Sequence, residues 1–323
     1  MAVTLTYNKS SLNRHNLSVE QHKQIKSVYS QALNVVQQKE IQFKALPDSA
    51  TKSLQLLRLN QLENDLRQKY NEISAEIETK VTGDMKSIAE RVAQEFEQQI
   101  RQFYPQFRIS YRDVSENVVA HITTGKVYEG DWTLSKAIWS QSQTTHNRIH
   151  EIVAIDVAAN KSAYEIAKDI EKFVDPTEAK ASRVIETPVY DWVNGKRVNT
   201  GRTEKYYFGQ VDYNAQRLAR TLVSHAFQQS IIETAEGLPW KKKIRWLAAH
   251  TNRMCEICES RDGRLYELDE VPMDHPNGMC DFEIVIETTP KEIHNRFQAW
   301  EDGNPDPELD RYAEFLMRDL KKV

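Results

Sequence analysis

The sequence has no long hydrophobic run and no excess of positive charge. No apolar stretch approaches the roughly 20 residues that a membrane-spanning helix needs. Acidic residues outnumber basic ones, 47 to 43, and the formal net charge is -4. The chain as a whole therefore lacks the positive field that would draw it onto nucleic acid, although local basic patches are compatible with this total.

Familiar catalytic motifs are also missing. The sequence contains no glycine-rich phosphate-binding loop, no Gly-x-Ser-x-Gly motif and no His-Glu-x-x-His motif. It has no internal repeat and no low-complexity tract. We therefore expect no catalytic residues and no small-molecule substrate, and we predict that the protein is not an enzyme.

Cysteine is scarce, with 3 residues in a chain of 323. The first residues, Met1 to Lys9, lack the charged start and apolar core of a signal peptide. We therefore expect synthesis in a reducing cytoplasm, where structural disulfides are rare. All the cysteines, Cys255, Cys258 and Cys280, lie in one short window near the C-terminus, so chemistry other than cross-linking has to be considered for them.

The sequence contains long segments with the apolar periodicity of α-helices. Ser18 and Gln21 have the spacing of a capping box, and an apolar stripe follows them. A second helix is predicted after a break at 46–49, with Gly83 interrupting it. Its apolar residues form a coiled-coil-like seam that needs a partner, either the first helix or another protein. The seam consists of Leu59, Leu62, Leu66, Tyr70, Ile73 and Ile77.

We predict an α+β fold that is predominantly α-helical. Residues 1–110 are expected to form a helical hairpin, and residues 111–237 a central helical region that includes a β-leaning run at 118–122. A β-hairpin arm is predicted at 182–211, because Asn194-Gly195 separates two β-forming runs. Residues 238–290 are expected to form a cysteine-bearing α+β module with a small β-ribbon, and residues 291–323 a helical tail.

The cysteine window has the spacing of a metal site. Two residues separate Cys255 from Cys258, and sixteen residues separate Cys258 from His275, which is followed by Cys280. Two thiolates from one turn and a histidine and a thiolate from another can complete the tetrahedron that zinc prefers. We predict a structural zinc ion, with His250 as a substitute ligand, that staples a ribbon of strands at 265–268 and 282–286, since such a ribbon buries little surface of its own.

Other interpretations of these residues stay open at this point. The thiols can be a redox pair or incidental, and Asp274-His275-Pro276 is superficially similar to the histidine motif of HNH nucleases. His225 lies on the predicted helix 212–236, where a satisfied interior histidine is the commoner case. The basic residues Lys241, Lys242, Lys243 and Arg245 are able to touch the phosphates of packaged DNA, although a solvated charged strand is the more frequent meaning of such a run.

Three segments resemble the minor head proteins of tailed phages, the family of the Mu F-like head morphogenesis proteins. They are Trp132 to Trp139, Asn214 to Thr221 and the cysteine window. The third is the most specific, since the family has Cys-x-x-Cys, an Asp-Gly turn and then His-Pro-x-Cys-x-Cys. Gly278 stands where the family has the first cysteine of its final pair, so Cys280 is the remaining thiol there.

This resemblance implies a structural head protein that binds the portal protein inside the virion. It implies a place near the portal vertex, assembly in the host cytoplasm, and roles in head morphogenesis, DNA packaging or DNA ejection. The major capsid protein or a scaffolding protein is a further expected partner, and no membrane is involved. The alternative is a zinc-containing DNA-binding protein or an HNH-like nuclease.

Overall fold

The computed structural model describes residues 3–46, 51–103, 105, 107–125, 134–159, 161–175, 183–193, 196–208, 213–249 and 255–320. The helices are α1 (Asn8–Lys44), α2 (Lys52–Ile100), α3 (Tyr111–Thr123), α4 (Leu134–Ala158), α5 (Ala163–Val174), α6 (Tyr213–Glu236), α7 (Glu256–Arg261), α8 (Pro290–Glu301) and α9 (Pro307–Leu320). The strands are β1 (Val3–Leu5), β2 (Arg183–Val193), β3 (Lys196–Phe208), β4 (Lys242–Leu247), β5 (Leu265–Tyr266) and β6 (Asp281–Ile286).

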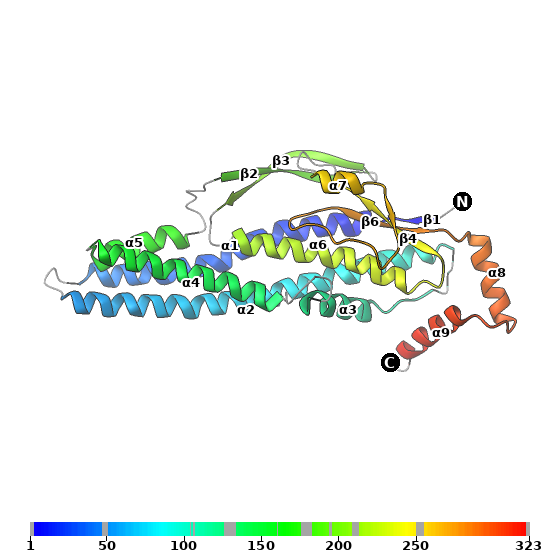
Figure 1. Ribbon diagram of the computed structural model, residues 1–323, viewed down its shortest axis with the longest axis horizontal. Helices are drawn as coiled ribbons and strands as arrows, with labels where there is room; N and C mark the ends of the chain where they lie inside the picture. The colour runs from blue at the N-terminus through cyan, green and yellow to red at the C-terminus, as the bar shows by residue number, and fades with distance from the viewer. Residues whose placement is uncertain are drawn as a thin grey trace.

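The molecule is mainly helical, as the sequence predicts. It is elongated, and its longest helices run along its length (Figure 1). α1 and α2 form the predicted hairpin, and α3, α4, α5 and α6 pack along it. All six residues of the α2 seam are buried, with Leu62 and Leu66 fully inaccessible. Tyr70 meets Tyr29 of α1, with ring centroids 6.0 Å apart. The partner of the seam is therefore this chain itself, and the hypothesis that the seam docks on another protein is wrong.

Three local predictions on the helical body are wrong. α1 begins ten residues before Ser18, whose hydroxyl instead accepts a hydrogen bond from Arg220 Nε at 2.9 Å. α2 continues through Gly83, because one glycine costs a helix only about 1 kcal/mol and buried apolar residues lie on both sides of it. The β-leaning run 118–122 belongs to α3, since burial of Val118 and Ile122 against α2 and α6 outweighs their β-propensity.

The predicted C-terminal ribbon is part of a four-stranded antiparallel sheet with the order β1-β6-β4-β5. The two strands expected to pair with each other, β5 and β6, lie on either side of β4, which contains the basic run except for Lys241, the residue before the strand. The N-terminal strand β1 pairs with β6, placing Val3 opposite Ile286. Trp246 of β4 and Phe282 of β6 fill the buried face, with ring centroids 5.0 Å apart. The strand order differs from the prediction because strands that pair across long stretches of sequence leave no local pattern from which the pairing could be predicted.

The predicted β-hairpin arm is present as β2 and β3. Their antiparallel ladder runs from Arg183 opposite Phe208 to Val193 opposite Lys196, with a shift in register between Pro188 and Tyr190. The predicted Asn194-Gly195 turn lies outside the described residues. β2 contacts α1 and β3 contacts α6, so the arm lies over these two helices (Figure 1).

The C-terminal tail consists of α8 and α9 at the end of the molecule that carries the sheet (Figure 1). Thr289 and Glu292 form a capping box at the start of α8. Tyr312 of α9 stacks on Phe107, with ring centroids 5.5 Å apart. Among the described residues, none of the helices is both long enough and apolar enough to cross a membrane.

Candidate metal centre

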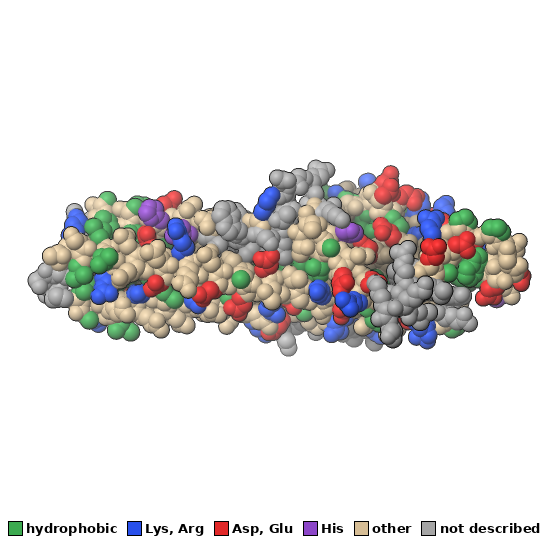
Figure 2. All heavy atoms as spheres, turned by 90° about the horizontal axis from the view of Figure 1, so that it is seen from below, with side chains coloured by type: hydrophobic (Ala, Val, Ile, Leu, Met, Phe, Trp, Pro, Cys, Tyr) green, Lys and Arg blue, Asp and Glu red, His purple; other side chains and the backbone are tan. Residues whose placement is uncertain are grey.

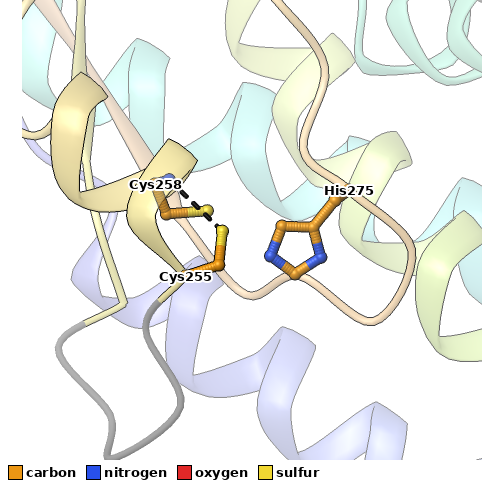
Figure 3. Close-up of side chains that lie close together, drawn as sticks. All are labelled: Cys255, Cys258 and His275. Carbon is orange, nitrogen blue, oxygen red and sulfur yellow. Dashed lines mark hydrogen bonds between the residues drawn. The ribbon is translucent and has the colours of Figure 1, made fainter.

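The first two cysteines lie at the start of the short helix α7. Cys255 is the N-cap residue of this helix, and its Sγ accepts a hydrogen bond from the backbone N–H of Cys258 at 3.3 Å (Figure 3). This N–H to sulfur contact turns both thiols to the same side of the helix start. Figure 3 shows the ring of His275, from the loop between β5 and β6, lying beside the two sulfur atoms.

The structure brings all four predicted ligands into one cluster, arranged as two overlapping groups. The ligand atoms of Cys255, Cys258 and His275 lie within 4.8 Å of one another. A second group, with the same limit, consists of Cys258, Asp274 and Cys280 and is completely buried. Cys258 belongs to both groups, so the cluster offers five donors, which are this thiol and four others around it. His250, the substitute ligand suggested by the sequence, lies outside the described residues.

Asp274 is the donor that the sequence analysis missed as a ligand. Its side chain is 0% exposed, and its Oδ1 lies 3.7 Å from Cys258 Sγ. Oδ1 accepts a hydrogen bond from the backbone N–H of His275 at 2.8 Å, and Oδ2 accepts one from the N–H of Cys280 at 2.9 Å. The carboxylate thus fixes the backbone at two of the predicted ligands. Asp274 lies next to His275 in the sequence, but the spacing of the motif does not show that the Asp274 side chain points into the protein.

Gly278 is required in this loop for space rather than for backbone conformation. A Cβ atom added at this position would lie 2.1 Å from Cγ of Asp274, far inside van der Waals contact. The left-handed backbone conformation belongs instead to Asn277, with φ of 66°, a residue type that tolerates it. The absent side chain at position 278 is therefore what allows the Asp274 carboxylate to occupy its buried position.

Helix α6 holds this loop through a row of polar side chains one helical turn apart. Thr221 Oγ1 accepts from the N–H of Asn277 at 3.0 Å, and Ser224 Oγ donates to the carbonyl of Gly278 at 2.9 Å. Gln228 donates to the carbonyl of Cys280 at 2.9 Å. Polar residues at i, i+3 and i+7, which share one face of a helix, were a signal that the sequence analysis left unused. They supply partners for backbone groups that the loop buries.

His225 belongs to the same row, and the expectation that it is a satisfied interior histidine is confirmed. It is 3% exposed, and its Nε2 lies 2.9 Å from the carbonyl oxygen of Asp274. Burial lowers the pKa of His225, which keeps the ring neutral near pH 7. It therefore supports the loop and is not one of the clustered donors.

Arg14 of α1 ties the far end of the loop to the helical body. This buried guanidinium donates to the carbonyls of Met279 and Cys280, both at 3.0 Å, and forms an ion pair with Asp281. It also lies over the ring of Phe227, 4.3 Å from the centroid. The Arg14 side chain, from the N-terminal helix, thus fixes the three consecutive residues from Met279 to Asp281.

The electrostatics of the three thiols differ. Burial raises the pKa of Cys258 and raises the pKa of Cys280 to about 11, with the nearby Asp274 charge acting in the same direction. Burial acts in that direction on Cys255 too, but hydrogen bonds from Cys258 outweigh it and lower the pKa of Cys255. A bound cation favours the thiolate form, so metal binding at this cluster releases protons and weakens as the pH falls.

The basic run on β4 is occupied by contacts within the chain. Lys241 pairs with Glu287 at 2.9 Å, Lys243 with Glu267 at 2.7 Å and Arg245 with Glu283 at 3.1 Å. Lys242 donates to the carbonyl of Leu238 at 2.6 Å, and burial lowers its pKa. Three of the four cations therefore have acidic partners that reduce the local positive field.

Fold and site together define a mainly helical protein with a small antiparallel sheet and a cysteine, histidine and aspartate cluster that can hold a metal ion. Comparisons of the chain with protein-family models, with curated proteins and with solved structures found no match.

Proposed function

We propose that this protein is a structural minor head protein of a tailed phage that binds the portal protein and catalyses no reaction. It acts inside the head near the portal vertex, after assembly in the host cytoplasm. There it assists head morphogenesis and the packaging or ejection of DNA. The major capsid protein or a scaffolding protein is a second partner on this hypothesis.

The observation that carries the proposal is a contact between two of the segments that resemble the Mu F-like proteins. Thr221, at the end of the Asn214 to Thr221 segment, accepts a hydrogen bond from Asn277 in the cysteine window. The two segments are 56 residues apart at this contact. A chance likeness in separate parts of a chain gives no reason for the parts to meet, so their contact supports the view that they belong to one structural unit.

Zinc is the metal we propose for the cluster. Thiolates and imidazole are ligands that zinc prefers, and Cys255, Cys258 and Cys280 supply three thiolates. Nearby polar groups orient the donors, as the Cys258 N–H does for Cys255. The ion would join α7 to the loop that α6 and Arg14 hold, and so would staple the sheet to the helical body. A site closed by four protein ligands performs no catalysis.

The alternative of a zinc-containing DNA-binding protein or an HNH-like nuclease has less support. The residues of the basic run are engaged as described, which leaves little free charge for phosphates. A hydrolytic metal site keeps one position open for water, whereas the protein donors of this cluster are sufficient to fill the four positions that zinc prefers. The neighbouring His225 is buried and supports the loop.

Exposed hydrophobic residues mark the surface on which we expect the portal to bind. Ile41 near the end of α1 is 72% exposed, and Leu57 near the start of α2 is 54% exposed. On the face seen in Figure 2, hydrophobic side chains are visible at this end of the molecule, far from the sheet, as they are at the opposite end. Apolar residues grouped in this way are typical of contact surfaces.

The test is co-expression with the tagged portal protein of the same phage, followed by affinity purification and sizing. Wild-type protein should elute with the portal, and the double variant Ile41→Lys, Leu57→Lys should lose at least about 90% of the complex, which corresponds to roughly 1.4 kcal/mol. Leu265→Lys is the matched control, since Leu265 is 47% exposed on β5 at the opposite end. No complex with wild-type protein, on the isolated portal or in procapsids, would reject the proposal.

A further inference from the structure

We propose that Asp274, and not His275, is the fourth ligand of the metal ion, alongside Cys255, Cys258 and Cys280. The inference rests on the proposed zinc ion and names the residue that completes its coordination. The spacing of the sequence favoured the histidine, because a His-Pro-x-x-x-Cys run places it near a thiol. The geometry of the folded chain points to the carboxylate beside it.

The first argument is the charge of Asp274. Its side chain is completely buried, and among the described residues no lysine or arginine lies within ion-pair distance of it. Its partners are two backbone N–H groups, the Cys258 thiol, which donates to Oδ1 at 3.7 Å, and the edge of His275, whose Nε2 is 3.9 Å from Oδ1. A buried carboxylate that lacks a cation is strongly unfavourable, and a divalent ion between the thiolates supplies the missing positive charge.

The second argument is the position of the carboxylate among the thiols. An oxygen of Asp274 and the sulfur atoms of Cys258 and Cys280 lie within 4.8 Å of one another. Zinc binds sulfur at about 2.3 Å and carboxylate oxygen at about 2.0–2.2 Å, so these three donors can share one ion after small shifts. Cys255 lies in the other group, with Cys258 and His275, and it joins the set through Cys258, whose backbone N–H donates to its Sγ. The loop is shaped for this position, since only a residue without a Cβ at 278 leaves room for the carboxylate.

His275, unlike Asp274, does not require a nearby cation to offset a buried charge. Its side chain is 45% exposed, and its Nδ1 lies 3.0 Å from the carbonyl of Pro276. Water can therefore satisfy the rest of the ring at little cost. His275 lies at the outer rim of the cluster, whereas Asp274, Cys258 and Cys280 are buried together.

The experiment compares Asp274→Asn, Asp274→Ala and His275→Ala with the wild-type chain. Zinc per chain is measured by elemental analysis after purification without chelators, and zinc affinity by competition with a chromogenic chelator. Cobalt is then substituted, because its visible spectrum reports a change of donor. We expect both Asp274 variants to bind zinc more than about 100-fold more weakly, beyond the 10–100-fold typical of residues that only orient ligands. His275→Ala should stay within about tenfold of wild type and keep its cobalt spectrum.

The outcomes separate the two hypotheses. If His275→Ala loses zinc or alters the cobalt spectrum while Asp274→Asn retains both, the assignment of Asp274 is overturned and zinc itself stands. Less than about one-tenth equivalent of zinc in the wild-type chain would instead reject the zinc ion, since a closed site of this kind binds tightly. Should Asp274→Ala fail to fold, as judged by circular dichroism, the isosteric Asp274→Asn decides.

Discussion

At the scale of single residues, the loop that contains Asp274 and Gly278 is so tightly packed that it depends on the exact size of its side chains. Gly278 has no Cβ, and Asp274 fills the volume that a Cβ would need. The donor cluster and the residues that hold it therefore form one packed unit, in which the removal or addition of a few atoms changes the whole loop. Substitutions here should cost far more than comparable ones on the helix surfaces.

Gly278→Ala is the sharpest substitution of this kind. The added methyl group collides with the Asp274 carboxylate, so we expect a loss of about 2–3 kcal/mol in the free energy of unfolding. Gly83→Ala on α2 is the control, because no atom lies within 4 Å of its added Cβ, and it should gain about 0.5–1 kcal/mol. Chemical denaturation measures both, and equal effects of the two variants would contradict the packing argument.

Arg14→Met tests the link between α1 and the loop. The variant leaves two buried carbonyls and the Asp281 carboxylate without their cation, so we expect it to lose about 3 kcal/mol of stability. Arg148→Met removes an exposed ion pair with Glu151 and should cost less than about 0.5 kcal/mol. Urea denaturation compares them, and a cost for Arg14→Met as small as that of the control would show that the link is not important.

At the scale of helices and strands, the sequence predicted what depends on local periodicity. The α2 seam, the end of α6 at Glu236 and the β2–β3 ladder were all expected, since spacing and breakers lie close together in the chain. The sheet order and the inward turn of Asp274 were not, because both depend on segments far apart in sequence. The ligand window could be located from spacing, whereas the choice among its donors requires their burial.

The contact between α1 and α5 should make stability depend on pH. Burial, with a hydrogen bond and repulsion from Glu171, raises the pKa of Glu40 to about 7. A folded-state pKa above the unfolded value of 4.5 means stability that is complete below about pH 4.5 and lost as the pH rises towards 7.

Glu40→Gln should remove this pH dependence, because the amide carries no proton to lose. Its melting temperature should exceed that of wild type at pH 8 and match it near pH 4.5. Glu20→Gln, at an exposed position on the same helix, should leave the wild-type profile unchanged. If the melting temperatures of wild type and Glu40→Gln changed in parallel between about pH 4.5 and pH 8, the assignment of the pH dependence to Glu40 would be refuted.

At the scale of the whole molecule, the two ends of the chain are built into the same unit. β1 pairs with β6, Arg14 of α1 holds the loop before β6, and α6 contacts both α1 and α2. The buried hydrophobic residues form a single cluster that extends from Leu5 to Tyr312. A metal ion at the loop would therefore stabilise the helical body as well as the small sheet.

Removal of the metal should accordingly destabilise the whole protein in one step. We expect a chelator to lower the melting temperature by about 5 °C, the shift that about 4 kcal/mol of ligand stabilisation gives in a chain of this length. Calorimetry should show one transition with and without the chelator, and added zinc should restore the original temperature. Cys258→Ser, which removes the thiol shared by both donor groups, should melt at the lower temperature and ignore the chelator. Separate melting of the sheet before the helices would mean that the cluster stabilises only its own loop.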